Sequence, residues 1–182
     1  MSISIPSWRY EEIKRIVVNL FVEYDVRCIP VSGFELASKM GIKVIPYSAY
    51  SHAVQKLMLK ESEDGFCVRR NDTNYIFYND SRSYGRINYT LLHEIGHIIL
   101  DHTEDSELAE KEVNFFAKYA LVPPILVHKL RIDNPTAIAN AFDVSYECAT
   151  YALSYYRKWL QYGSSDYTDY EIILLKLFDG AA

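Results

Sequence analysis

The chain has 182 residues, of which 49% are hydrophobic and 24% charged, and this composition is that of a globular protein rather than a disordered or fibrous one. Its formal net charge of −5 argues against a nucleic-acid binder, because proteins that neutralise phosphates carry a basic excess. Its three cysteines are widely spaced without a CxxC pair, and no apolar run approaches the roughly 20 residues that span a bilayer, so we expect a cytoplasmic protein without a membrane segment.

Hydrophobic periodicity predicts a chain of mostly helical segments. The predicted helices cover residues 9–24, 33–40, 89–101, 105–121, 125–130, 135–142, 146–161 and 170–178. Asn88 or Thr90 is the expected N-cap of the helix over 89–101, and Asp105 or Ser106 that of the next one.

A small group of strands is predicted between the second and third of these helices. Residues 42–47, 66–69 and 74–78 have strand patterns, with a turn at 71–73, while the pattern of 53–60 is ambiguous. We interpret 74–79 as a candidate edge strand that could bind an extended peptide, with an interior strand as an equal alternative.

The order of helices, small sheet and further helices is typical of the α+β class. We find no repeat, low-complexity tract or linker, so we expect a single domain over residues 1–182. Within it, residues 1–123 would form the core and 124–182 a helical C-terminal subregion.

The motif that carries chemistry is His93-Glu94-Ile95-Gly96-His97, which fits HExxH. Residues four apart on a helix point the same way, so the two imidazoles can share one zinc ion. Glu94 is rotated by about 100° from His93 and can act as the general base. The alternative is two core histidines hydrogen-bonded to backbone, with Glu94 reaching solvent.

A catalytic zinc needs a third protein ligand. His102 lies five residues past His97 and would point about 140° away on a continuous helix, so we expect it at the helix C-terminus instead. Glu112 lies on the buried face of the following helix and is our expected third ligand, with a surface carboxylate as the alternative reading. Glu107 and Glu110 have the positions of solvated side chains.

These residues resemble the ImmA/IrrE family of metallopeptidases. The resemblance rests on His93–Leu100 followed by His102, on Glu112-Val113-Asn114-Phe115-Phe116-Ala117, and on Leu121-Val122-Pro123. Val113 stands where the family usually has Ala. The similarity extends over roughly residues 35–160, and the spacing from HExxH to Glu-x-Asn-x-Phe-Ala is its most specific part.

The resemblance implies a zincin-like core, in which a small, mostly antiparallel sheet packs on the HExxH helix. It also implies zinc on His93, His97 and Glu112, with Glu94 as the base of a selective endopeptidase. Family members typically inactivate a helix-turn-helix repressor encoded beside them in phages, mobile elements or stress operons. A tyrosine or His128 could stabilise the oxyanion, and the sequence does not choose between them.

Two other functions compete with the peptidase. Residues 137–145 and the helix after them resemble a helix-turn-helix, but that helix begins with Tyr146 and Glu147 rather than with base-reading residues. We therefore interpret it as a packing or docking segment and expect no direct binding to nucleic acid. The other alternative is a non-catalytic zinc-binding regulator that docks a repressor without cleaving it.

Overall fold

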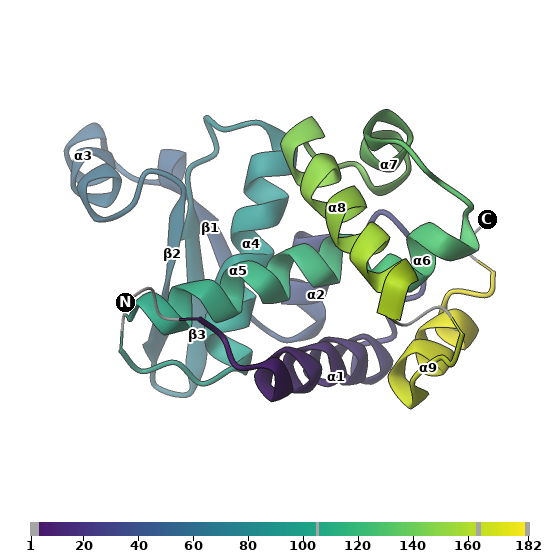
Figure 1. The fold of residues 1–182 in the computed structure, drawn as a ribbon. Helices are drawn as coiled ribbons and strands as arrows, with labels where there is room; N and C mark the ends of the chain where they lie inside the picture. The colour runs from purple at the N-terminus through teal and green to yellow at the C-terminus, as the bar shows by residue number, and fades with distance from the viewer. Residues whose placement is uncertain (1–3, 105, 163–164, 181–182) are drawn as a thin grey trace. The chain divides into compact units, whose positions relative to one another are not determined.

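A computed structural model describes residues 4–104, 106–162 and 165–180. The described residues form two compact units (Figure 1). The first lies mainly in Ser32–Ala117, and the second combines Ile5–Val31 with Lys118–Ala182. The single domain with a boundary at 123 stays a prediction. None of the helices in the described segments is long and apolar enough to cross a membrane.

The first unit contains the sheet and the helices packed on it, which confirms the α+β class. Its elements are α2 (Gly33–Lys39), β1 (Lys43–Pro46), the 3-10 helix η1 (Tyr47–Ala49), α3 (His52–Glu61), β2 (Gly65–Arg70), β3 (Thr73–Tyr78), α4 (Tyr84–Ile99) and most of α5 (Glu107–Leu121). The ambiguous segment 53–60 is thus helical. Ser32 caps α2, since its side chain accepts a hydrogen bond from the backbone N–H of Glu35.

The three strands have the order β1-β3-β2. β2 and β3 form an antiparallel hairpin, whereas β1 pairs with β3 in parallel. Asn71 and Asp72, both with positive φ, form the two-residue turn of the hairpin. The interpretation of 74–79 as an edge strand is therefore wrong, and the alternative of an interior strand is confirmed. β3 pairs with β1 on one side and with β2 on the other, which leaves β2 at one edge.

Helix α4 packs against β2, β3 and α2. Its apolar side chains Leu91, Leu92 and Ile95 are fully buried. A side chain at Gly65 would collide with Thr90 of α4 at 2.7 Å, so this glycine permits a close approach of helix and strand.

Helix α4 begins at Tyr84, one and a half turns before the predicted start. The expected cap Asn88 is inside the helix and 1% exposed, where its side chain accepts a hydrogen bond from the N–H of Gly33 at 2.6 Å. Gly85 disfavours a helix by only about 1 kcal/mol, which tertiary contacts can override. Ser106 caps α5, accepting from the N–H of Ala109; Asp105 lies outside the described residues.

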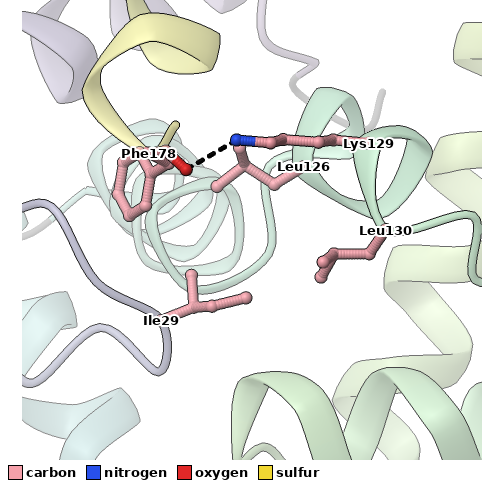
Figure 2. A pocket seen from close by; sticks show the side chains of 5 residues that line it. All are labelled: Ile29, Leu126, Lys129, Leu130 and Phe178. Carbon is pink, nitrogen blue, oxygen red and sulfur yellow. Dashed lines mark hydrogen bonds between the residues drawn. The ribbon is translucent and has the colours of Figure 1, made fainter. Parts of the chain in front are cut away.

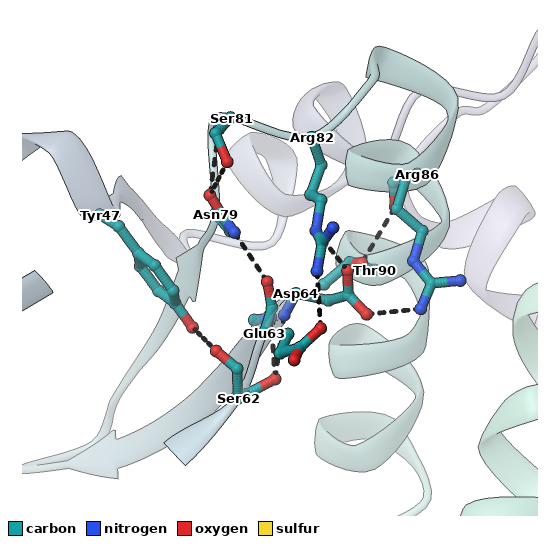
Figure 3. A network of polar contacts seen from close by, with 10 residues as sticks. Tyr47, Ser62, Glu63, Asp64, Asn79, Ser81, Arg82, Arg86 and Thr90 are labelled. Atoms are coloured by element: carbon teal, nitrogen blue, oxygen red, sulfur yellow. Dashed lines mark hydrogen bonds and ion pairs between the residues drawn. The ribbon is translucent and has the colours of Figure 1, made fainter. Parts of the chain in front are cut away.

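A polar network holds the first turns of α4 in place (Figure 3). Arg86 of α4 pairs with Asp64, which also binds Arg82 at 3.1 Å. Asn79 donates to the carbonyl of Glu63 at 2.8 Å and ties the loop before α4 to the start of β2. The Arg86 guanidinium, which hydrogen-bonds to Asp64, lowers the pKa of that carboxyl below its ordinary value.

The second unit consists of helices in its described part. They are α1 (Ser7–Glu23), the last turn of α5, α6 (Pro124–Lys129), α7 (Pro135–Phe142), α8 (Tyr146–Tyr162) and α9 (Asp169–Leu177). A pocket within this unit is lined by Ile29, Leu126, Lys129, Leu130 and Phe178 (Figure 2). Its one charged group, the Lys129 amine, donates to the carbonyl of Phe178 at 2.6 Å, so the pocket presents no catalytic pair.

We predict that Asp64→Asn destabilises the protein near pH 7 by up to about 1 kcal/mol, a small effect because solvent screens exposed ion pairs. The pKa of Asp64 is depressed by folding, so its contribution is present above about pH 4 and disappears as the pH falls through the lowered value. Urea unfolding at pH 7 and pH 3, beside the exposed control Asp166→Asn, measures this difference. An equal destabilisation at both pH values would contradict the role of the charge.

Candidate metal centre

Two histidines of α4 face each other across one helical turn. The Nε2 atoms of His93 and His97 are 3.3 Å apart, and their side chains are 16% and 11% exposed. The helix itself produces this arrangement, since residues i and i+4 lie on the same face. Both rings therefore present one nitrogen to the same point.

Glu110 of α5 supplies a third donor at this point. Its carboxylate oxygens lie 3.5 Å from Nε2 of His93 and 3.2 Å from Nε2 of His97. The sequence pattern assigned Glu110 to solvent, and its side chain is indeed 48% exposed although its oxygens reach both rings. Among the described residues, these three form the group that could hold a metal ion.

The spacing of the two ring nitrogens and of the Glu110 carboxylate is compatible with a zinc ion. Ligands at 2.0–2.1 Å from a tetrahedral ion lie about 3.3–3.4 Å from one another. The two ring nitrogens are 3.3 Å apart here, and each is approached by a different oxygen of Glu110, at 3.5 Å from Nε2 of His93 and at 3.2 Å from Nε2 of His97. Two imidazoles and one carboxylate are also a known donor set of catalytic zinc. The residues present thus fit a zinc ion.

The environment of His93 keeps its ring available as a ligand. Burial, together with the neighbouring His97, lowers the pKa of His93 to about 4, so the ring is neutral at physiological pH. The side chain of Asn114 hydrogen-bonds to His93 and also accepts a 2.5 Å hydrogen bond from the hydroxyl of Tyr89. Asn114 follows Glu110 by four residues, so a single face of α5 provides both a donor and a support.

Glu112, the third ligand expected from the sequence, is not brought to the histidine pair. It is buried, as its helical position predicts, with 6% exposure, but its carboxylate lies 3.2 Å from Nε2 of His102. Glu110 and Glu112 are about 200° apart around the helix, so one helix cannot direct both to the same point. Burial alone did not distinguish which buried neighbour Glu112 would meet.

His102 lies next to His97 because α4 ends between them. The helix stops at Ile99, and Asp101 adopts a positive φ of 55°. The N–H of His102 then donates to the carbonyl of His97 at 3.1 Å. His102 thus stays at the helix C-terminus as expected, but its ring turns back towards His97.

Glu94 is buried against the sheet, at 7% exposure. Its carboxylate hydrogen-bonds to the thiol of Cys67 on β2, and burial together with this negative charge raises the pKa of Cys67 to about 12. Burial, and secondarily Glu94, likewise raises the pKa of Tyr47 to about 12. The Glu94 carboxylate is therefore held beside β2, between the two histidines of its own helix in sequence.

Gly96, between the two histidines, allows α5 to approach α4. A side chain at this position would meet Phe116 at 3.0 Å and Val113 at 3.3 Å. The glycine within HExxH thus helps to bring Glu110 within reach of the rings.

The family comparison agrees with this site. The family model described as the IrrE N-terminal-like domain, of peptidase family M78, matches residues 37–154 and so covers more than half of the chain. The chain belongs to the IrrE N-terminal-like peptidase family. This membership confirms the resemblance to the ImmA/IrrE metallopeptidases, and the matched segment includes all the residues of the centre. A comparison with curated proteins gives no match.

In this IrrE-like peptidase the two candidates for an oxyanion-stabilising group lie in different units. His128 belongs to the second unit, where its Nδ1 lies 3.0 Å from the hydroxyl of Tyr156 and its ring contacts Trp159 and Tyr167. In the first unit, Tyr89 lies with its ring centroid 6.2 Å from that of His93. Asn114, Tyr89 and Cys67 were not predicted as site residues, and Glu110 was predicted to face solvent. The four-residue spacing of Glu110 and Asn114 is the signal that could have revealed part of this set.

We predict that Cys67 resists alkylation at pH 8. A pKa of about 12 instead of 9 reduces its thiolate fraction about 1,000-fold, and the thiolate is the reactive form. Iodoacetamide labelling followed by peptide mass spectrometry, with the exposed Cys28 as internal control, measures the two rates. In Glu94→Gln the rate at Cys67 should rise, because the negative charge beside the thiol is removed. Equal rates at Cys67 and Cys28 in the wild type would contradict this arrangement.

Proposed function

We propose that this chain is a zinc-dependent metallo-endopeptidase in which His93, His97 and Glu110 hold the metal and Glu94 is the general base. The observation that carries the proposal is the convergence of two ring nitrogens, 3.3 Å apart, with the carboxylate of Glu110, whose oxygens lie 3.5 and 3.2 Å from them. A bound zinc ion would supply Lewis acidity, which polarises a carbonyl and makes water acidic enough to lose a proton near pH 7.

Glu94 would carry protons during hydrolysis. Its carboxylate takes one proton from the attacking water as the oxygen bonds to the scissile carbonyl carbon. It then delivers that proton to the amide nitrogen as the C–N bond breaks, so that a carboxylic acid and an amine result. Its position directly after His93 on α4 supports this role, because one turn of helix then carries both a metal ligand and the base.

The free edge of β2 is a suitable place for an extended substrate. β2 lies at one edge of the three-stranded sheet and carries Cys67, whose thiol contacts Glu94. A peptide added along this edge would obtain main-chain hydrogen bonds and would pass the base without needing a free terminus. This geometry favours an endopeptidase over an exopeptidase.

We further infer that the substrate is a helix-turn-helix transcriptional repressor in the cytoplasm, encoded in a phage, mobile element or stress operon, and that cleavage relieves repression. The resemblance to the ImmA/IrrE family motivates this substrate. The net charge of −5 supports it, because an acidic protein associates readily with a basic DNA-binding partner.

The metal site predicts about one zinc ion per chain when the protein is purified without chelator. Glu110→Gln should weaken zinc binding by more than about 100-fold, because losing a ligand costs more than losing a supporting contact. The matched control is Glu107→Gln on the same helix, an exposed carboxylate that pairs with Lys111 at 2.6 Å and should leave affinity unchanged. A wild-type protein that takes up no zinc, even after zinc is added, would refute the proposed function.

Glu94→Gln distinguishes an enzyme from a docking protein. Incubated with the repressor encoded by a neighbouring gene, the wild type should produce two fragments by mass spectrometry. The variant should cleave on the order of 100- to 10,000-fold more slowly while retaining zinc. If the variant is as effective as the wild type in relieving repression, the protein acts by binding alone.

A further inference from the structure

Glu112 and His102 form a polar chain that ends at His97. Nε2 of His102 lies 3.2 Å from the Glu112 carboxylate, and Nδ1 of His102 lies 3.3 Å from Nδ1 of His97. The His102 and Glu112 side chains are 13% and 8% exposed, so the contact between them is largely shielded from water. This polar chain ends at Nδ1 of His97, whereas Nε2 of the same ring faces His93 and Glu110.

The direction of these hydrogen bonds follows from the role of His97. If Nε2 of His97 is a ligand, the hydrogen of that ring must be on Nδ1, so that Nδ1 donates to Nδ1 of His102. His102 then carries its hydrogen on Nε2 and donates it to the Glu112 carboxylate. In this polar chain each donor thus faces an acceptor of the neighbouring side chain.

We propose that Glu112 and His102 are positioning residues for His97, an inference that rests on the proposed metal site. Glu112 orients His102, and His102 fixes both the tautomer and the rotation of the His97 ring. Metal-binding histidines usually donate their second nitrogen to a carboxylate, carbonyl or water, and loss of that partner typically lowers metal affinity 10- to 100-fold. Here a second imidazole stands between the ligand and the carboxylate.

Hydrogen bonds to backbone carbonyls at the end of α4 hold His102 in position. The carbonyl of His97 accepts hydrogen bonds from the N–H of His102 at 3.1 Å and from the Arg69 guanidinium at 3.2 Å. Arg69 also donates to the carbonyl of Ile98 at 3.0 Å and pairs with Asp101 at 2.5 Å. β2 therefore fixes the end of α4, so that the ring of His102 is directed towards Glu112 rather than solvent.

The decisive comparison is of zinc affinity, by chelator competition, in Glu110→Gln, Glu112→Gln, His102→Ala and the control Glu107→Gln. We expect a 10- to 100-fold loss for Glu112→Gln and for His102→Ala, a larger loss for Glu110→Gln and none for the control. The double variant of Glu112 and His102 should lose no more than the worse single variant, because both act through one chain. Additive losses, or a greater loss for Glu112→Gln than for Glu110→Gln, would overturn the proposal.

A second readout does not need the metal. In metal-free protein the Glu110 carboxylate, 3.2 Å from Nε2 of His97, competes for the hydrogen of that ring. Nitrogen-15 NMR of the histidine rings should therefore show a larger fraction of His97 protonated on Nδ1 in the wild type and in Glu107→Gln than in His102→Ala, which lacks the acceptor at Nδ1. Thermal unfolding of each variant separates this effect from general destabilisation. If the wild type bound no zinc, the proposed function would fail, and the His97 tautomer would still decide the positioning role: an unchanged tautomer in His102→Ala refutes it.

Discussion

Helix α4 buries polar groups that need partners, and much of the first unit is organised by that need. The helix is apolar on nearly all sides, yet it carries two imidazoles and a carboxylate into the interior, where unpaired polar groups cost several kcal/mol. α5 supplies Glu110 and Asn114 to the rings, and β2 supplies Cys67 to Glu94. The helix is stable in this position because α5 and β2 provide hydrogen-bond partners for its buried polar groups.

Close packing and chemistry are linked at two glycines. Gly65 lets α4 lie against β2, and Gly96 lets α5 lie against α4. A larger residue at either position would move a whole helix by part of an ångström or more. Because three donor atoms must converge within about 0.2 Å of their ideal distances to hold zinc, such a movement would affect the site directly.

Glu110 and Glu112 of α5 have different surroundings and, in our proposal, different roles. Glu110 is half exposed with its oxygens at the two rings, whereas Glu112 is buried and meets His102. An exposed ligand beside an open position suits a site that must admit a peptide. A buried carboxylate, in contrast, is shielded from competing water and can hold a ring in one orientation.

The sequence by itself determined the local features: the extents of most helices, the hairpin turn, the start of α5 at Ser106, and the pairing of His93 with His97. These depend on hydrogen bonds and spacings within a few residues. The tertiary structure decided the central place of β3, the early start of α4 and the choice of Glu110 over Glu112 at the histidines. Those features depend on how separate elements approach and rotate against one another, and a helical burial pattern specifies an inward face without specifying which neighbour that face meets.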